Sequence, residues 1–170
     1  MKHPFERVPA GRRRAAMLAL VLATAPVMAA MALIDRALSP GIVGLELCAF
    51  RGTCDEVIAA YRPAGLEVGL SLGLDYLFLP LYAATLAAAV VFAAARRSER
   101  TRWAAGLIAW GATCAAGFDA VENAAMYHMV STGTSAAGWI ASGAAAIKFA
   151  LVALAIVALP VIALRPKRAG

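Results

Sequence analysis

The sequence predicts an all-α integral membrane protein, a four-helix bundle formed as a single domain over residues 1–170. Three observations support this fold class: 62% of the residues are hydrophobic, only 15% are charged, and the mean hydropathy is +0.76. Soluble domains average about 45–50% apolar and about 25% charged residues. A soluble domain of this size could not bury so much apolar surface, because it hides only about 70% of what its unfolded chain exposes.

Four apolar segments are long enough to cross a bilayer, which takes about 20 residues for a hydrocarbon core of about 30 Å. Lipid offers no partner to unpaired backbone groups, so each segment should be helical. The strands of a β-barrel would be shorter and would alternate apolar with polar residues. The predicted spans are residues 15–37, 69–95, 103–130 and 140–164.

The first segment also has the outline of a signal peptide. Arg12–Arg14 precede its apolar run, and Ala30–Ala32 resembles a small-residue cleavage site. The run from Ala15 to Ile34 is nevertheless long for a signal peptide and long enough to span a bilayer. We therefore expect this segment to be retained as the first span.

Basic residues predict the orientation of the bundle, because membrane proteins keep most Lys and Arg of their short loops in the cytoplasm. One side carries only Arg36, Arg51 and Arg62. We therefore expect both termini to be cytoplasmic in a bacterial inner membrane. This orientation also explains the net charge of +6, so no nucleic-acid partner is predicted. The basic residues of the cytoplasmic side are Lys2, Arg7, Arg12, Arg13, Arg14, Arg96, Arg97, Arg100, Arg102, Arg165, Lys167 and Arg168.

The only long connection is the outer loop 38–68, which has Pro and Gly near both ends and is therefore rich in turns. Thr53 followed by Glu56 is the pattern of a capping box. It predicts one short amphipathic helix that runs through Tyr61 and is ended by Pro63. We expect this segment to lie on the outer membrane surface, with an ordinary surface loop as the alternative.

Two of the three cysteines, Cys48 and Cys54, lie in this loop. The outer compartment favours disulfides, so we predict a bond between them, with two reduced cysteines as the alternative. Cys114 lies in the third span, where we expect a small packing residue.

Four ionisable residues lie within the predicted spans: Asp75, Asp119, Glu122 and Lys148. Such residues are costly there, at about 2.5–3.5 kcal/mol for Asp, Lys or Arg at a helix centre. Asp119, Glu122 and Asn123 share one helical face because they are spaced three and four residues apart. That face continues through small residues, so it should point into the bundle.

The predicted site has more negative than positive charge. Asp75 shares a helical face with Tyr82 in the second span, and counting about 1.5 Å per residue places all four ionisable groups in the outer half. Three carboxylates and one ammonium sum to a formal −2, which requires protons, a bound cation or water in a low dielectric. The predicted binding site comprises Asp75, Tyr82, Asp119, Glu122, Asn123 and Lys148.

A purely structural interpretation of the same residues stays open. In it Lys148 pairs with Glu122 or Asp119, Asp75 bonds Tyr82, and the charges only lock the helix packing. The protein would then be a structural or assembly subunit of a membrane complex. In the functional interpretation the site binds or moves a small amphiphile, a lipid or a cation.

A lipid-modifying membrane enzyme is a third alternative, based on two carboxylates at different burial. The sequence contains no Ser–His or Cys–His pair, phosphate loop or HExxH motif, so a non-enzymatic role is favoured. We predict no cofactor and no metal ligand. The expected partners are the lipid bilayer, a lipid or small amphiphile, and either a second copy of the chain or another membrane subunit.

Two stretches resemble a family of small, uncharacterised bacterial multi-span membrane proteins. These stretches are Leu72–Phe78 with Tyr82, and Phe118–Asn123. They match an Asp-aromatic-x-Phe motif in the second span of that family and Asp-x-x-Glu-Asn in the third. The region of Glu46 and the predicted helix ending near Tyr61 are also similar to its outer loop, whereas the cysteine pair is a departure. The resemblance implies no particular activity, but it singles out Asp75, Asp119, Glu122 and Asn123.

Overall fold

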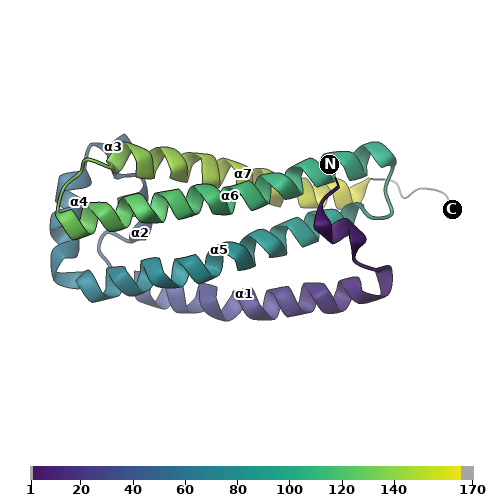
Figure 1. Ribbon diagram of the computed structural model, residues 1–170, viewed down its shortest axis with the longest axis horizontal. Helices are drawn as coiled ribbons and strands as arrows, with labels where there is room; N and C mark the ends of the chain where they lie inside the picture. The colour runs from purple at the N-terminus through teal and green to yellow at the C-terminus, as the bar shows by residue number, and fades with distance from the viewer. Residues whose placement is uncertain (1, 166–170) are drawn as a thin grey trace.

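The computed structural model describes residues 2–165, which form helices and no strand. Four long helices lie side by side along the molecule, and short helices gather at one end of them (Figure 1). Each long helix is long and apolar enough to cross a membrane. They are α1 (Arg13–Asp35), α5 (Gly65–Ala94), α6 (Glu99–Thr132) and α7 (Gly138–Leu164).

The helix α6 extends past its predicted span at both ends. Ser98 caps its first turn, because its Oγ accepts a hydrogen bond from the backbone N–H of Thr101. Gly133 ends the helix with φ 73°, the left-handed conformation that favours glycine after a helix C-terminus. The predicted span 103–130 lies between these two caps.

Small residues bring α5, α6 and α7 close together. Ala87 of α5, Ala109 and Ala115 of α6, and Ala145 of α7 have no exposed surface. Small side chains allow the backbones of membrane helices to approach closely, which maximises van der Waals contact in the absence of a hydrophobic driving force. These three helices therefore form the interior of the molecule.

The helix α1 is attached differently, because none of its residues is buried. Among the long helices it packs against α5. The Thr24 hydroxyl donates to the carbonyl of Leu20 and lies 2.9 Å from Thr85 Oγ1 of α5. Because α1 packs against α5 without burying any of its residues, Met28 and Met31 are left to line a space beside α7.

The connection between α1 and α5 contains three short helices, and the last of them covers the segment that was predicted to be helical through Tyr61. They are α2 (Ile42–Glu46), α3 (Cys48–Arg51) and α4 (Cys54–Tyr61). The side chain of Thr53 makes no capping hydrogen bond, so the expected capping box does not form. Thr53 has φ −115° and ψ 12°, outside the extended backbone conformation typical of an N-cap.

This connection packs against the ends of the long helices. Leu45, Ile58 and Tyr61 are buried in one apolar cluster with Met126 and Met129 of α6. A disulfide joins Cys48 to Cys54, as the sequence predicted. The short helices are therefore fixed against the ends of α5, α6 and α7, close to the predicted polar residues.

The N-terminal segment folds back onto α5 and α6 at the opposite end, where α1 begins and α7 ends (Figure 1). Its 3-10 turn spans Pro4–Arg7. The ring of Phe5 packs edge-on against Phe92, with centroids 6.1 Å apart. The buried His3 lies 5.0 Å from the indole of Trp110, measured between ring centroids.

Two further sequence predictions concern Cys114 and the basic residues near the C-terminus. Cys114 is exposed on α6, so the expected packing role is wrong. It stands seven residues from both Leu107 and Val121, two turns along the same helical face, and these side chains are also exposed. Lys167 and Arg168, which belong to the predicted cytoplasmic group, lie outside the described residues.

Candidate functional site

Lys148 is the centre of a buried ionic cluster. Its Nζ lies 2.8 Å from Glu122 Oε2, 3.1 Å from Asp119 Oδ1 and 3.2 Å from Glu46 Oε1. All four residues are buried, and Glu122 is fully enclosed. The cluster joins α7 to α6 and to α2. Every ion pair found within residues 2–165 belongs to it.

The local sequence explains why these groups meet. Asp119 and Glu122 are three residues apart on α6, so both carboxylates project from one face. The neighbouring turn of α7 presents Ala141 and Ala145, which are both fully buried. Because these residues are small, α6 and α7 approach closely and the Lys148 side chain reaches both carboxylates.

Asp75 and Asn123 form a second polar link, between α5 and α6. The side-chain amide of Asn123 donates to Asp75 Oδ2 at 2.5 Å. The alternative bond from Asp75 to Tyr82 is not present, and the Tyr82 hydroxyl has no hydrogen-bond partner. Seven residues separate Asp75 from Tyr82 along α5, a rise of about 10 Å, so Asn123 on the neighbouring helix is the nearer partner.

Glu46 is the member of the cluster that the binding-site prediction omitted. It ends the five-residue helix α2, in a segment that was expected to lie outside the spans. A hydropathy average over about 19 residues cannot detect a helix as short as α2. The available signal was local: Glu46 stands between Leu45 and Leu47, an acidic residue within an otherwise apolar run.

With Glu46 included, the excess of negative charge is larger than the sequence predicted. Glu46, Asp119 and Glu122 surround one ammonium and Asp75 adds a further carboxylate beside Asn123, so the formal sum is −3. Burial of uncompensated charge is expensive, and a full −3 would not persist without protons, a cation or water. The cluster therefore has unused capacity to bind positive charge or hydrogen-bond donors.

A cavity of about 470 Å³ opens beside the cluster. Its sides are apolar and come mainly from three helices: Met28 and Met31 of α1, Phe78 and Leu86 of α5, and Phe149, Val152 and Ile156 of α7. Its polar end is formed by Glu46, Asp75, Tyr82, Asp119 and Lys148, with Thr24 and Thr85 farther along. Polar and apolar parts are thus separated within one space.

Two of the residues that line this cavity carry a buried side-chain oxygen with no hydrogen-bond partner. These oxygens are Glu46 Oε2 and the hydroxyl oxygen of Tyr82, on residues that are 7% and 8% exposed. Buried polar groups are nearly always paired, because leaving one unpaired costs about 1–3 kcal/mol. Both oxygens therefore retain hydrogen-bonding capacity next to the cavity.

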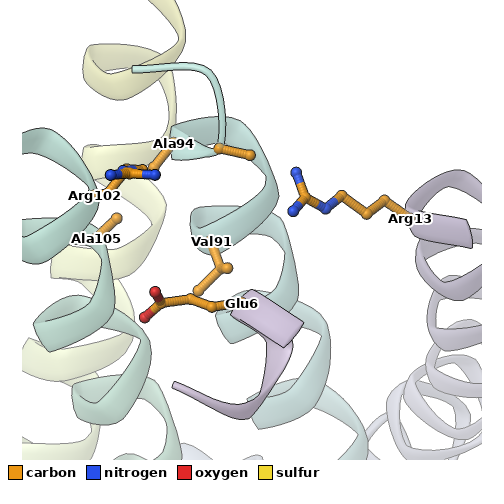
Figure 2. A pocket seen from close by; sticks show the side chains of 7 residues that line it. Glu6, Arg13, Val91, Ala94, Arg102 and Ala105 are labelled. Carbon is orange, nitrogen blue, oxygen red and sulfur yellow. The ribbon is translucent and has the colours of Figure 1, made fainter. Parts of the chain in front are cut away.

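A second, smaller cavity of about 70 Å³ lies at the opposite end of the molecule. Figure 2 shows Arg13 reaching from α1 toward α5, with Glu6 in the N-terminal segment and Arg102 on α6. This volume is well below the roughly 300 Å³ at which ligand pockets begin. We therefore place the candidate site at the Lys148 end.

The cysteines are positioned near the site but outside it. Cys48 follows Glu46 by two residues, and the backbone N–H of Ala49 donates to Ser142 Oγ of α7 at 3.2 Å. The disulfide thus fastens the segment that carries Glu46. Within residues 2–165 no group of three His, Cys, Asp or Glu side chains is arranged to hold a metal ion.

The fold and the cluster together define a class: a multi-pass membrane protein with a buried ionic cluster beside a largely apolar cavity. Comparison with known proteins adds no narrower assignment, because no family model, no curated protein and no solved structure matches the chain.

Proposed function

We propose that this protein binds an amphiphile from the membrane, with its apolar tail in the cavity between α1 and α7 and its polar head at the Lys148 cluster. One observation carries the proposal: a cavity of about 470 Å³ has apolar sides and ends at a buried ionic cluster. The volume falls within the range of about 300–1,000 Å³ that is typical of small-molecule sites.

Entry from the bilayer is supported by the exposure of the cavity walls. Met28 of α1 is 55% exposed and Ile156 of α7 is 53% exposed, although both line the cavity. An apolar tail could therefore enter sideways between the two helices without crossing water. The weak attachment of α1, which has no buried residue, would let this side widen.

The positive-inside rule would place the cluster toward the outer face of a bacterial inner membrane, with both termini cytoplasmic. The short helices α2–α4 lie at the end of the molecule that carries few basic residues. In this orientation the head of the ligand would be held below the outer surface, and its tail would run along α1 and α7 toward the cytoplasmic half.

A packing role for the same charges is the second candidate, and a specific observation favours it. Lys148 ties together α2, α6 and α7 through three carboxylates, an arrangement that can specify how helices assemble. A packing role alone would not account for the cavity or for the unpartnered Tyr82 hydroxyl. We therefore rank ligand binding first.

Photo-crosslinking in membranes tests ligand binding directly. A small diazirine amino acid replaces Val152, which lines the cavity, or Leu154, which is 52% exposed on another face of α7. We expect the label at position 152 to capture one class of amphiphile, whereas position 154 should capture bulk lipids in proportion to their abundance. Mass spectrometry of the adducts identifies both.

Position 154 serves as the matched control, because it tests the same helix and a similar depth in the membrane. Adducts of identical composition at the two positions would contradict a selective site. An absence of adducts at position 152, with normal labelling at position 154, would contradict occupancy of the cavity by any lipid.

A further inference from the structure

We infer that the head of the ligand ends in a primary ammonium group, so that the protein selects amphiphiles that carry this group. This inference rests on the proposed function and narrows its ligand class. It is carried by three features: the sign of the charge at the cavity, the unpartnered oxygens on two residues that line it, and the saturation of the Lys148 ammonium.

The polar end of the cavity is rich in acceptors. Glu46, Asp75 and Asp119 all line it, and each brings a carboxylate. Asp119 and Glu46 each give one oxygen to Lys148, and Asp75 gives one to Asn123. The remaining carboxylate oxygens carry unused lone pairs, and Glu46 Oε2 is both buried and unpartnered.

Lys148 has no donor left for a ligand. An ammonium carries three N–H donors, and Lys148 directs them to Glu46, Asp119 and Glu122 at 3.0–3.2 Å. An anionic head, such as a carboxylate or phosphate, would have to displace one of these partners. It would also add negative charge to a cluster whose formal sum is already −3.

A primary ammonium head supplies both the positive charge and the hydrogen-bond donors that the cluster lacks. It donates up to three hydrogen bonds and accepts none, which matches free acceptors at Glu46 Oε2 and the Tyr82 hydroxyl oxygen. Its charge reduces the formal excess by one. An alcohol carries no charge and donates only one hydrogen bond, whereas an ammonium is also attracted directly to the carboxylates, so we expect an amine to bind at least about tenfold more tightly than an alcohol.

Such a head occurs on free long-chain amines and on aminophospholipids. The shared chemistry is the ammonium, and the experiment separates the two sources. Full-length protein in lipid nanodiscs is titrated with dodecylamine, dodecanol or dodecanoate, which have equal tails and differ in head charge. In a second arm, native mass spectrometry compares retention of phosphatidylethanolamine and phosphatidylglycerol with identical acyl chains.

We expect dodecylamine to bind at least tenfold more tightly than dodecanol, and dodecanoate to bind more weakly still. Glu46→Gln should remove most of the preference for the amine, because it should weaken amine binding far more than dodecanol binding. Tyr82→Phe serves as the second variant, because the lost hydroxyl has no partner in the protein and its removal should not disturb folding. It should weaken amine binding several-fold.

Val152→Trp narrows the cavity. Binding that is lost in this variant is therefore assigned to the cavity. Preferential retention of phosphatidylethanolamine would identify a lipid source, and amine binding without it would identify a free amine. Equal binding of amine and alcohol, both lost in Val152→Trp, would overturn the inference while the proposed function stands. Preference for dodecanoate would overturn the inference in the same way, and binding unaffected by Val152→Trp would overturn both.

Discussion

Lys148 determines the local chemistry of the site, because it is the cation to which three buried carboxylates are paired. Removing it would leave Glu46, Asp119 and Glu122 without a positive partner. Breaking a buried pair from one side costs about 3–5 kcal/mol, chiefly through the uncompensated charge that is left. The identity of this one side chain therefore decides whether α2, α6 and α7 can assemble as observed.

We predict that Lys148→Met lowers the free energy of unfolding by about 3–5 kcal/mol, measured by denaturation in mixed micelles. Ile147→Met is the matched control, because Ile147 is the adjacent residue of α7 and is exposed. The control should stay within about 0.5 kcal/mol of the wild type. Equal effects of the two substitutions would show that the ion pairs contribute nothing to stability.

His3 provides a pH-dependent contact at the other end of the molecule. Burial lowers the pKa of its imidazole from 6.5, and the carboxylate of Glu6 opposes this change by raising it. A pKa that is lower in the folded state means that protonation favours release of the N-terminal segment. The contribution of His3 is therefore complete above pH 6.5 and is lost as the pH falls below that value.

Hydrogen exchange of the amides of Glu6 and Val8 tests this prediction. These amides donate to the carbonyls of His3 and Phe5 in the docked segment. Their protection factors should fall between pH 7.5 and pH 5 in the wild type and stay constant in His3→Gln. A fall of equal size in the variant would assign the effect to another group.

Among the secondary-structure elements, the short helices α2–α4 affect the site most, because α2 places Glu46 in the ionic cluster. The disulfide encloses a loop with a sequence separation of 6. Closing a loop of this size in the unfolded chain corresponds to about 2 kcal/mol of stabilisation. The bond thus keeps α3 and α4 together and limits how far α2 can move from Lys148.

We predict that Cys48→Ser with Cys54→Ser lowers the free energy of unfolding by about 2 kcal/mol. Cys114→Ser is the matched control, because Cys114 is an exposed free cysteine on α6. Thiol alkylation of the denatured wild type should modify one cysteine before reduction and three after it. Three reactive thiols without reduction would contradict the bond.

The same elements show what a sequence reveals about such a protein and what it leaves hidden. Asp119, Glu122 and Asn123 were predicted to share an inward face because helical periodicity alone fixes that relation, and all three are buried. The partners of Lys148 were foreseen only in part. Glu46 lies 102 residues away and enters the cluster through a five-residue helix, a tertiary contact that no local pattern encodes.

The cavity was also beyond the reach of sequence analysis. Hydropathy predicted a first span near residues 15–37, but it could not indicate that α1 packs against α5 without burying any of its own residues. The space beside α7 results from this packing. The unpartnered Tyr82 hydroxyl likewise follows from the choice of Asn123 as the partner of Asp75.

At the scale of the whole molecule, α1 begins and α7 ends at the same end of the molecule (Figure 1). From the positive-inside rule we expect that end to lie in the cytoplasm. We predict that a fluorescent protein fused to the C-terminus folds and fluoresces in a bacterial host, while alkaline phosphatase at the same position stays inactive. A fusion of phosphatase within residues 52–53 should be active, and the reverse pattern would contradict the orientation.

We propose that the cavity between α1 and α7 holds a membrane amphiphile whose head meets the Lys148 cluster. Native mass spectrometry of gently extracted wild type, Val152→Trp and Leu154→Trp tests this proposal. We predict one additional bound mass per chain in the wild type and in Leu154→Trp, and its loss in Val152→Trp. A bare mass in all three folded proteins, or equal retention in all three, would contradict the claim.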